Sequence, residues 1–183
     1  MGDALGAAGS IVGIVAFGLK LATTLQTYVE TVADAEQTLQ DIAFEVSTTA
    51  SALKQLQDLI EADALATQEN RLPVLNANGK REIESLGRKC ETVYQAIVHL
   101  LVKSNGADVE GHLAKSTSIA DLEALKTKTL FGKLKWPWVE KKIKKHQGEL
   151  RWLKMSLLLH IQIAQLAQTG STKMSVTINS FLS

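Results

Sequence analysis

The side chains that most often carry catalysis or bind metals are histidine, cysteine and the carboxylates, and their spacing in this chain fits neither role. The chain has 183 residues and a single cysteine, Cys90, so no second thiolate is available for a disulfide or a shared metal. No glycine-rich loop is followed by the lysine–serine pair of a phosphate site. The four histidines show no metal-ligand spacing: His99, His112, His146 and His160. We therefore expect no enzyme activity, no metal and no cofactor, and we expect Cys90 to be a small buried hydrophobe.

A basic stretch between Lys126 and Lys154 has residue types that fit a ligand. It carries ten lysine and arginine residues against two acidic ones, and nine of the ten are lysine. Aromatic residues interrupt the lysines, and tryptophan favours the headgroup level of a membrane while lysine attracts anionic lipid. The residues expected to contact anionic lipid are Lys133, Lys135, Trp136, Trp138, Lys141, Lys142, Lys144 and Lys145.

Nucleic-acid binding and a solvated helix face are the two other interpretations of this basic stretch. Sequence-specific nucleic-acid binding favours arginine and a recognisable reading module, so we expect no specific nucleic-acid partner. A solvated helix face whose tryptophans pack inward would also explain the composition. The charge distribution favours some role for the stretch, because residues 1–70 hold ten acidic and only two basic residues although the net charge is +1.

The second candidate is the apolar start of the chain, Ala4 to Leu19, which has sixteen residues and no charge. As a helix it would be about 24 Å long, less than the roughly 30 Å of a hydrocarbon layer. Its glycines are spaced by four, which lets helices approach closely in lipid or in a tight bundle. It can therefore be a buried central helix at rest or a helix that inserts conditionally. The residues of the expected inserting helix are Gly2, Leu5, Gly6, Gly9, Ile11, Val12, Gly13, Ile14, Val15, Phe17 and Leu19.

The rest of the chain predicts the elements that hold these two segments. Only two prolines occur and 45% of the residues are hydrophobic, so we expect an all-α bundle of about four long helices and a short one. The expected helices are 3–30, 34–63, 80–103, 119–127 and 137–168, in one domain over 1–170. Gly170 is expected to end the last helix and 171–183 to be a tail or linker.

Apolar residues at spacings of three and four predict the core. The turn signal Asn78-Gly79 separates the second helix from the third, and the acidic residues of the second helix, Glu45 among them, lie off its apolar stripe. The residues expected to be buried are Leu39, Ile42, Val46, Leu53, Leu86, Val93, Ile97, Leu150, Leu157 and Ile161. A single cysteine and a start without basic residues before Lys20 favour an intracellular protein without a secretory signal.

Three stretches carry a resemblance to a known family. They are the opening MGDALGAAGSIVGIVAFGLKLATTLQTYV, the segment LKQLQDLI, and LKWPWVEKKIKKHQGELRWLKMSLLLHIQIAQLA. Over roughly residues 1–168 the chain resembles the HeLo-like N-terminal domain of fungal STAND (NLR-like) proteins. That family is related to the HeLo domain of the HET-S incompatibility protein and, more distantly, to the bundle of the mixed lineage kinase domain-like protein of necroptosis.

The resemblance implies a role in programmed cell death, heterokaryon incompatibility and innate immunity of fungi. A sensor or amyloid-forming part clusters such domains, the N-terminal helix is released, and a cytoplasmic protein moves to the plasma membrane and permeabilises it. The implied partners are an anionic phospholipid membrane, further copies of the chain, and a sensor on a C-terminal part or on a separate protein. A soluble interaction or oligomerisation module is the alternative, because the apolar stripes also suit partner helices.

Overall fold

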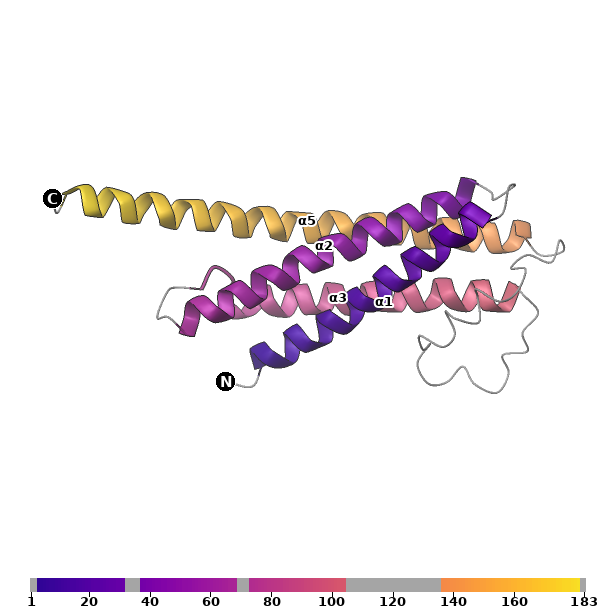
Figure 1. Ribbon diagram of the computed structural model, residues 1–183, viewed down its shortest axis with the longest axis horizontal. Coiled ribbons are helices and arrows are strands. Elements are labelled where there is room, and N and C mark those ends of the chain that lie inside the picture. Colours follow the sequence, from indigo (N-terminus) through magenta and orange to yellow (C-terminus); the bar gives the residue numbers. More distant parts are fainter. Residues whose placement is uncertain (1–2, 32–36, 69–72, 105–135, 182–183) are drawn as a thin grey trace.

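The computed structural model describes residues 3–31, 37–68, 73–104 and 136–181, and these form an all-α bundle with no strand in the described ranges. Its helices are α1 (Asp3–Thr31), α2 (Gln37–Gln68), α3 (Ala77–Ser104) and α5 (Trp136–Phe181). Figure 1 shows α3 and α5 along the length of the molecule, with α1 and α2 crossing them obliquely. The short helix predicted for 119–127 falls outside the described residues.

The helices are arranged so that α1 and α5 do not touch. In the described part of the chain, α1 packs against α2 and α3, and α5 packs against the same two helices. One end of the bundle gathers the end of α1, the start of α2, the end of α3 and the start of α5 (Figure 1). The opposite end holds the start of α1 and the start of α3, and α5 extends beyond it.

The core is built from the apolar stripes that the sequence predicts. Nine of the ten predicted core residues are buried, and the tenth, Leu86, is partly buried against the same cluster. Helix α2 contributes a stripe at spacings of three and four, and helix α1 adds Ile11, Ile14, Val15, Leu21, Ala22 and Leu25. The all-α prediction is therefore confirmed.

The start of α3 corrects a prediction. We expected Asn78-Gly79 to form a turn before a helix that begins near Lys80, but α3 begins at Ala77. The reason is Asn76, whose side-chain Oδ1 accepts a hydrogen bond from the Gly79 N–H at 2.8 Å and so caps the helix. The Lys80 N–H then donates to the Asn76 carbonyl at 3.1 Å. Helix α2 likewise runs to Gln68, past its predicted end at 63.

The end of α5 corrects a second prediction about helix ends. Gly170 does not stop the helix, which continues to Phe181 through most of the predicted tail. A glycine inside a helix costs about 1 kcal/mol but keeps its N–H donor, and no proline follows it to break the hydrogen-bond ladder. At 46 residues α5 is about 69 Å long. Within the described residues, none of the helices is both long and apolar enough to cross a membrane.

Candidate functional site

The first candidate site is α1, which lies on the bundle with one face buried and another exposed. Ile11, Ile14 and Val15 are buried between α2 and α3. On the other side Val12 is 43% exposed and Leu19 is 42% exposed, and Phe17 is partly buried. A helix surrounded on all sides was one expectation for this segment, and it is wrong because α5 does not reach α1. The helix therefore presents apolar side chains to solvent as well as to the core.

Helix α1 approaches α2 and α3 closely at Gly18. A Cβ atom at this position would lie 2.7 Å from Cε2 of Tyr94 on α3 and 3.1 Å from the Cβ of Ala50 on α2. Real Cβ atoms essentially never come as close to another atom as 2.7 Å, so only glycine lets the Tyr94 ring lie flat against the α1 backbone. Gly87 of α3 also faces α1, but a Cβ there would meet Ile14 at 3.5 Å, which is an ordinary van der Waals contact.

The predicted close approach through Gly13 does not occur in this structure. Gly13 is exposed, and a Cβ atom placed on it would have no neighbour within 4 Å. Gly6 and Gly9 lie within α1, as does Leu5, but their side-chain surroundings are outside the description, and Gly2 precedes the described residues. Sequence reasoning thus missed that Gly18, and not Gly13, carries the contact with the bundle.

Tyr94 brings an unsatisfied polar group to this contact. Its side chain is fully buried, and its hydroxyl has no hydrogen-bond partner among the described residues. Burial raises the pKa of the phenol, so the hydroxyl stays neutral. A buried donor without a partner costs about 1–3 kcal/mol. The ring that carries this hydroxyl is the one that faces Gly18 of α1.

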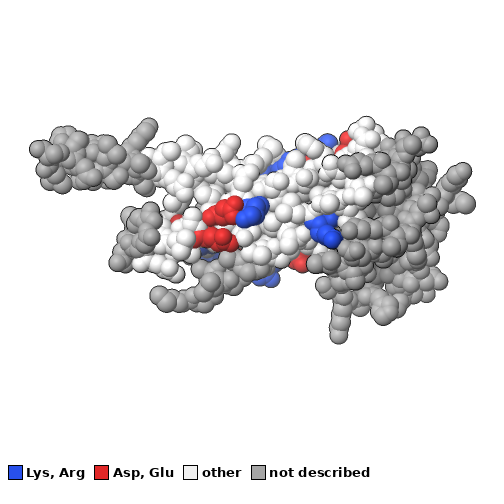
Figure 2. Space-filling model, viewed as in Figure 1, with Lys and Arg blue, Asp and Glu red and all other residues white. Residues whose placement is uncertain are grey.

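The second candidate site is the basic first half of α5. Lys141, Lys144 and Lys145 are exposed and Lys142 is partly exposed. Two of them have acidic neighbours one turn away: Lys144 pairs with Glu140, and the Lys145 ammonium lies 3.6 Å from Glu149. Exposed pairs of this kind contribute little to stability, so the lysines can exchange these carboxylates for other anions. Figure 2 shows few charged side chains on the face that it displays.

The structure describes little of the remaining residues that were predicted to contact lipid. Trp136 and Trp138 belong to the first turn of α5, but their side chains are not described, and Lys133 and Lys135 precede the described range. Trp152, the third tryptophan of the stretch, is 74% exposed. The alternative in which the tryptophans pack inward is therefore wrong for Trp152.

Glu45 of α2 makes a contact with α5 that the sequence did not predict. It is buried, and its carboxylate accepts hydrogen bonds from Arg151 Nε at 2.8 Å and from Lys154 Nζ at 2.7 Å. Burial alone would raise the pKa of Glu45, but the hydrogen bonds from Lys154 and Arg151 outweigh it and lower the pKa. Glu45 therefore offsets one of the two positive charges that Arg151 and Lys154 place near the middle of α5.

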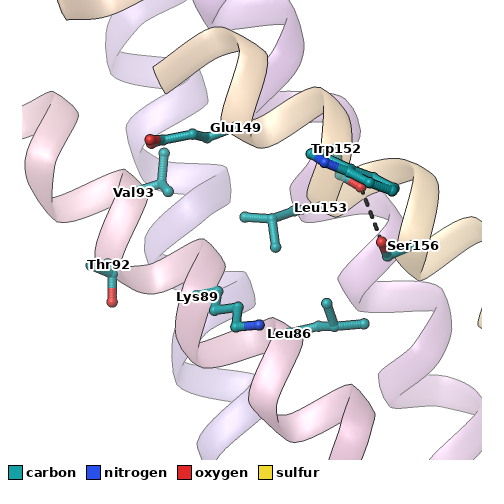
Figure 3. A pocket seen from close by; sticks show the side chains of 8 residues that line it. All are labelled: Leu86, Lys89, Thr92, Val93, Glu149, Trp152, Leu153 and Ser156. Carbon is teal, nitrogen blue, oxygen red and sulfur yellow. Dashed lines mark hydrogen bonds between the residues drawn. The ribbon is translucent and has the colours of Figure 1, made fainter. Parts of the chain in front are cut away.

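A shallow groove lies between α3 and α5 beside Trp152. Its hollow measures about 470 Å³, and Figure 3 shows Lys89 and Thr92 on one side and Trp152 and Ser156 on the other. Leu86, Val93 and Leu153 supply its apolar lining. The Ser156 hydroxyl is occupied by the Trp152 carbonyl at 3.2 Å. The groove holds no pair of residues arranged for acid–base or nucleophilic chemistry.

The described residues also contain no group of three histidine, cysteine or acidic side chains that could hold a metal ion. Cys90 is buried, as the sequence predicts, and burial raises the pKa of its thiol to about 12. A thiol in this state is a poor nucleophile at neutral pH. Comparisons with protein-family models, with curated proteins and with solved structures find no match to this chain.

Proposed function

We propose that this chain is a membrane-acting effector domain that binds anionic membranes and permeabilises them by releasing and inserting α1. One observation carries the proposal: among the described helices α1 packs against α2 and α3 and not against α5, and its residues 11–19 are uncharged and apolar on the buried and the exposed face alike. Its departure leaves the contacts of α5 with α2 and α3 intact. A helix that is apolar on both faces is normally buried in a protein core or in a membrane, and is rarely exposed on a soluble bundle.

Helix α1 is docked through an extensive contact with α2 and a smaller one with α3, and the groups buried at this contact act in opposite directions. Docking buries Ile11, Ile14 and Val15, which stabilises the closed state. It also covers the Tyr94 hydroxyl without a partner, which opposes the closed state. Release would return water to this hydroxyl, so part of the free energy lost on release is offset at the same place.

The position of the lysines supports the same proposal. Helix α1 ends at Thr31 at the end of the bundle where α5 begins, and the Thr38 hydroxyl of α2 lies 3.3 Å from Glu140 of α5 at that end. A membrane bound by Lys141, Lys144 and Lys145 would then lie at the end of the bundle where α1 ends. This end would act as the hinge when α1 leaves the bundle. Each lysine near an anionic surface contributes about 1 kcal/mol to binding.

Insertion of α1 requires no complete crossing by one helix. An amphipathic helix buries its apolar face about 5–10 Å into the boundary between headgroups and acyl chains, and several such helices disturb the bilayer. The permeabilising state therefore contains several copies of the chain. The proposal extends to the HeLo-like resemblance: a fungal cell-death domain, cytoplasmic at rest, that is clustered by a sensor and acts at the plasma membrane.

A reversible lock on α1 tests the proposal. In a Cys90→Ala background, Gly18→Cys with Ala50→Cys places two Cβ atoms near the 3.5–4.5 Å of a disulfide, because a Cβ at Gly18 lies 3.1 Å from the Ala50 Cβ. The same protein is then compared oxidised and reduced, so the disturbance of Tyr94 is common to both states. We expect the reduced form to release dye from vesicles containing anionic lipid and the oxidised form to release none.

Equal leakage from the oxidised and reduced forms would show that α1 does not need to leave α2, and the membrane proposal would be abandoned. A second candidate function would then apply: a soluble interaction module. The observation that favours it is the row of exposed apolar side chains on α5, which includes Met155, Leu159 and Leu166. The absence of leakage from either form, together with concentration-dependent self-association, would support that module.

A further inference from the structure

Helix α5 carries a second apolar stripe that the bundle does not use. Trp152, Met155, Leu159, Ile163 and Leu166 follow one another at spacings of three, four, four and three, and each is more than half exposed. We call these five residues the outer stripe.

The outer stripe lies opposite the buried stripe of the same helix. With 100° per residue, the buried Leu150, Leu157, Ile161 and Ala164 point about 180° away from it. The contacts of α5 with α2 and α3 are made by the buried stripe, so no movement within the bundle can cover both. An apolar stripe of heptad-like spacing on the outside of a helix is the pattern by which helices pair.

Within the stretch of α5 that carries the outer stripe, the sequence holds few charges. From Met155 to Gln168 the only ionisable residue is His160, whose Nε2 lies 3.2 Å from Glu82 of α3. Lys154, at the other end, is turned toward Glu45. The stripe is therefore neutral and apolar over four turns, which suits a second copy of the chain better than a charged partner.

Its area is sufficient for a pair. The five side chains leave on the order of 600 Å² exposed in one copy, so a symmetric contact that covered them completely would bury at most about 1,200 Å², the lower limit for specific interfaces. The interface would be apolar at its centre, as in homodimers. The shape of the stripe also fits an isologous contact, in which each residue meets its counterpart across a two-fold axis.

We propose that two copies of this chain pair antiparallel through their outer stripes, with the two-fold axis at Leu159. In this register Leu159 meets Leu159, Met155 meets Ile163, and Trp152 meets Leu166, because each pair of positions is spaced equally on either side of residue 159. All five members of the stripe thus gain an apolar partner without a gap.

The lysines of α5 select the antiparallel direction. Lys141 and Lys145 lie three and two turns before Trp152 on the same side of the helix. In a parallel pair they would face the same lysines of the second copy. In the antiparallel pair the two Lys145 residues are about 40 Å apart, which exceeds the Debye length of about 8–10 Å at physiological ionic strength. The same register brings position 145 level with position 173 of the second copy, which is also a lysine. The lysines therefore disfavour the parallel direction, but the antiparallel pair keeps one like-charge encounter near each end.

The inference concerns self-association in solution and does not depend on membrane action. Its first test is sedimentation velocity of the full chain without lipid, over a range of concentrations. We expect a monomer–dimer equilibrium, and we expect Leu159→Lys to weaken dimerisation at least tenfold because two lysines would meet at the axis. The matched control is Leu65→Lys on α2, since Leu65 is 60% exposed and Leu159 is 55% exposed. The control should dimerise like the unaltered chain.

Cysteine cross-linking tests the direction and register. Leu159→Cys should give a disulfide-linked dimer under mild oxidation, whereas Leu166→Cys should not, because its two copies would be about 21 Å apart along the pair. Cys90 is buried and does not compete.

A chain that stays monomeric at every concentration overturns the inference. So does equal weakening by Leu159→Lys and Leu65→Lys, or cross-linking of Leu166→Cys as fast as Leu159→Cys. A monomer whose vesicle binding is lost in Leu159→Lys would assign the outer stripe to lipid instead.

Discussion

At the scale of single residues, two glycines of α1 have opposite surroundings. Gly18 is pressed against Tyr94 and Ala50, whereas Gly13 has open space where a Cβ would be. The sequence presents them as members of one glycine-rich segment. Their separate roles depend on the way the helix faces the bundle, so they follow from the packing and not from the spacing of the glycines.

Alanine substitutions at Gly13 and at Gly18 form a matched pair of experiments. Gly13→Ala should raise the free energy of unfolding by about 0.5–1 kcal/mol, because alanine favours the helix and meets no neighbour. Gly18→Ala should lower it by about 1–3 kcal/mol relative to Gly13→Ala, because the Tyr94 ring must move. Urea denaturation of both variants checks this. Equal stability of the two would mean that α1 does not lie on Tyr94 in solution.

The Tyr94 hydroxyl gives a second prediction. Tyr94→Phe removes a buried group that has no partner in the described residues and leaves the ring in place, so we expect about 1 kcal/mol of added stability. If docking of α1 restrains membrane action, the same variant should release less dye from anionic vesicles. Thermal unfolding and vesicle leakage measure the two effects separately. A loss of stability in Tyr94→Phe would reveal a partner for the hydroxyl.

At the scale of elements, the contact of α2 with α5 depends on one buried carboxylate. Glu45→Gln keeps the shape of the side chain but leaves Lys154 and Arg151 without a counter-charge. We expect a loss of about 1–3 kcal/mol at pH 7, below the value for fully buried pairs because Arg151 is mostly exposed. Asp58→Asn, which breaks an exposed pair with Lys54 on the same helix, should change the unfolding free energy little.

The pH dependence of this loss has a definite sign. The pKa of Glu45 is lowered in the folded state, so its stabilisation is present above the pKa of the unfolded carboxyl group, about 4.3, and is lost as the pH falls through the folded value. The difference between the unaltered chain and Glu45→Gln should therefore shrink on acidification below about pH 4.5. Denaturation curves at several pH values measure it, and a constant difference would contradict the ion-pair interpretation.

The helices and the core could be predicted from the sequence because both depend on local periodicity. The stripe through Leu39, Ile42 and Val46 is readable from spacing alone. Helix ends depended on single hydrogen bonds, as at Asn76, or on the absence of a breaker, as at Gly170, and were predicted less well. Glu45 could not be recognised, because its burial depends on two cations that are more than a hundred residues away in sequence.

At the scale of the whole molecule, the arrangement separates two surfaces. Among the described helices, α1 and α5 are diagonal to each other in the bundle, and each packs against both α2 and α3. A chain built in this way can pair through the outer stripe of α5 while α1 stays free to leave. Dimerisation and membrane insertion therefore do not compete for the same side chains, although both would be needed in an assembly of several copies.

The basic start of α5 gives the last prediction. Reversal of Lys141, Lys142, Lys144 and Lys145 to glutamate should abolish binding to anionic vesicles at low salt, because each lysine contributes about 1 kcal/mol near the surface. The matched control reverses four exposed cations on α2 and α3, namely Lys54, Arg81, Arg88 and Lys89. Both variants change the net charge equally, so long-range attraction alone would weaken binding to the same extent in both. If the start of α5 faces the membrane, only the first variant loses binding in a vesicle flotation assay. Binding by the first variant that equals the control, with both folded by circular dichroism, would remove α5 from the membrane contact and leave α1 as the remaining lipid-binding segment.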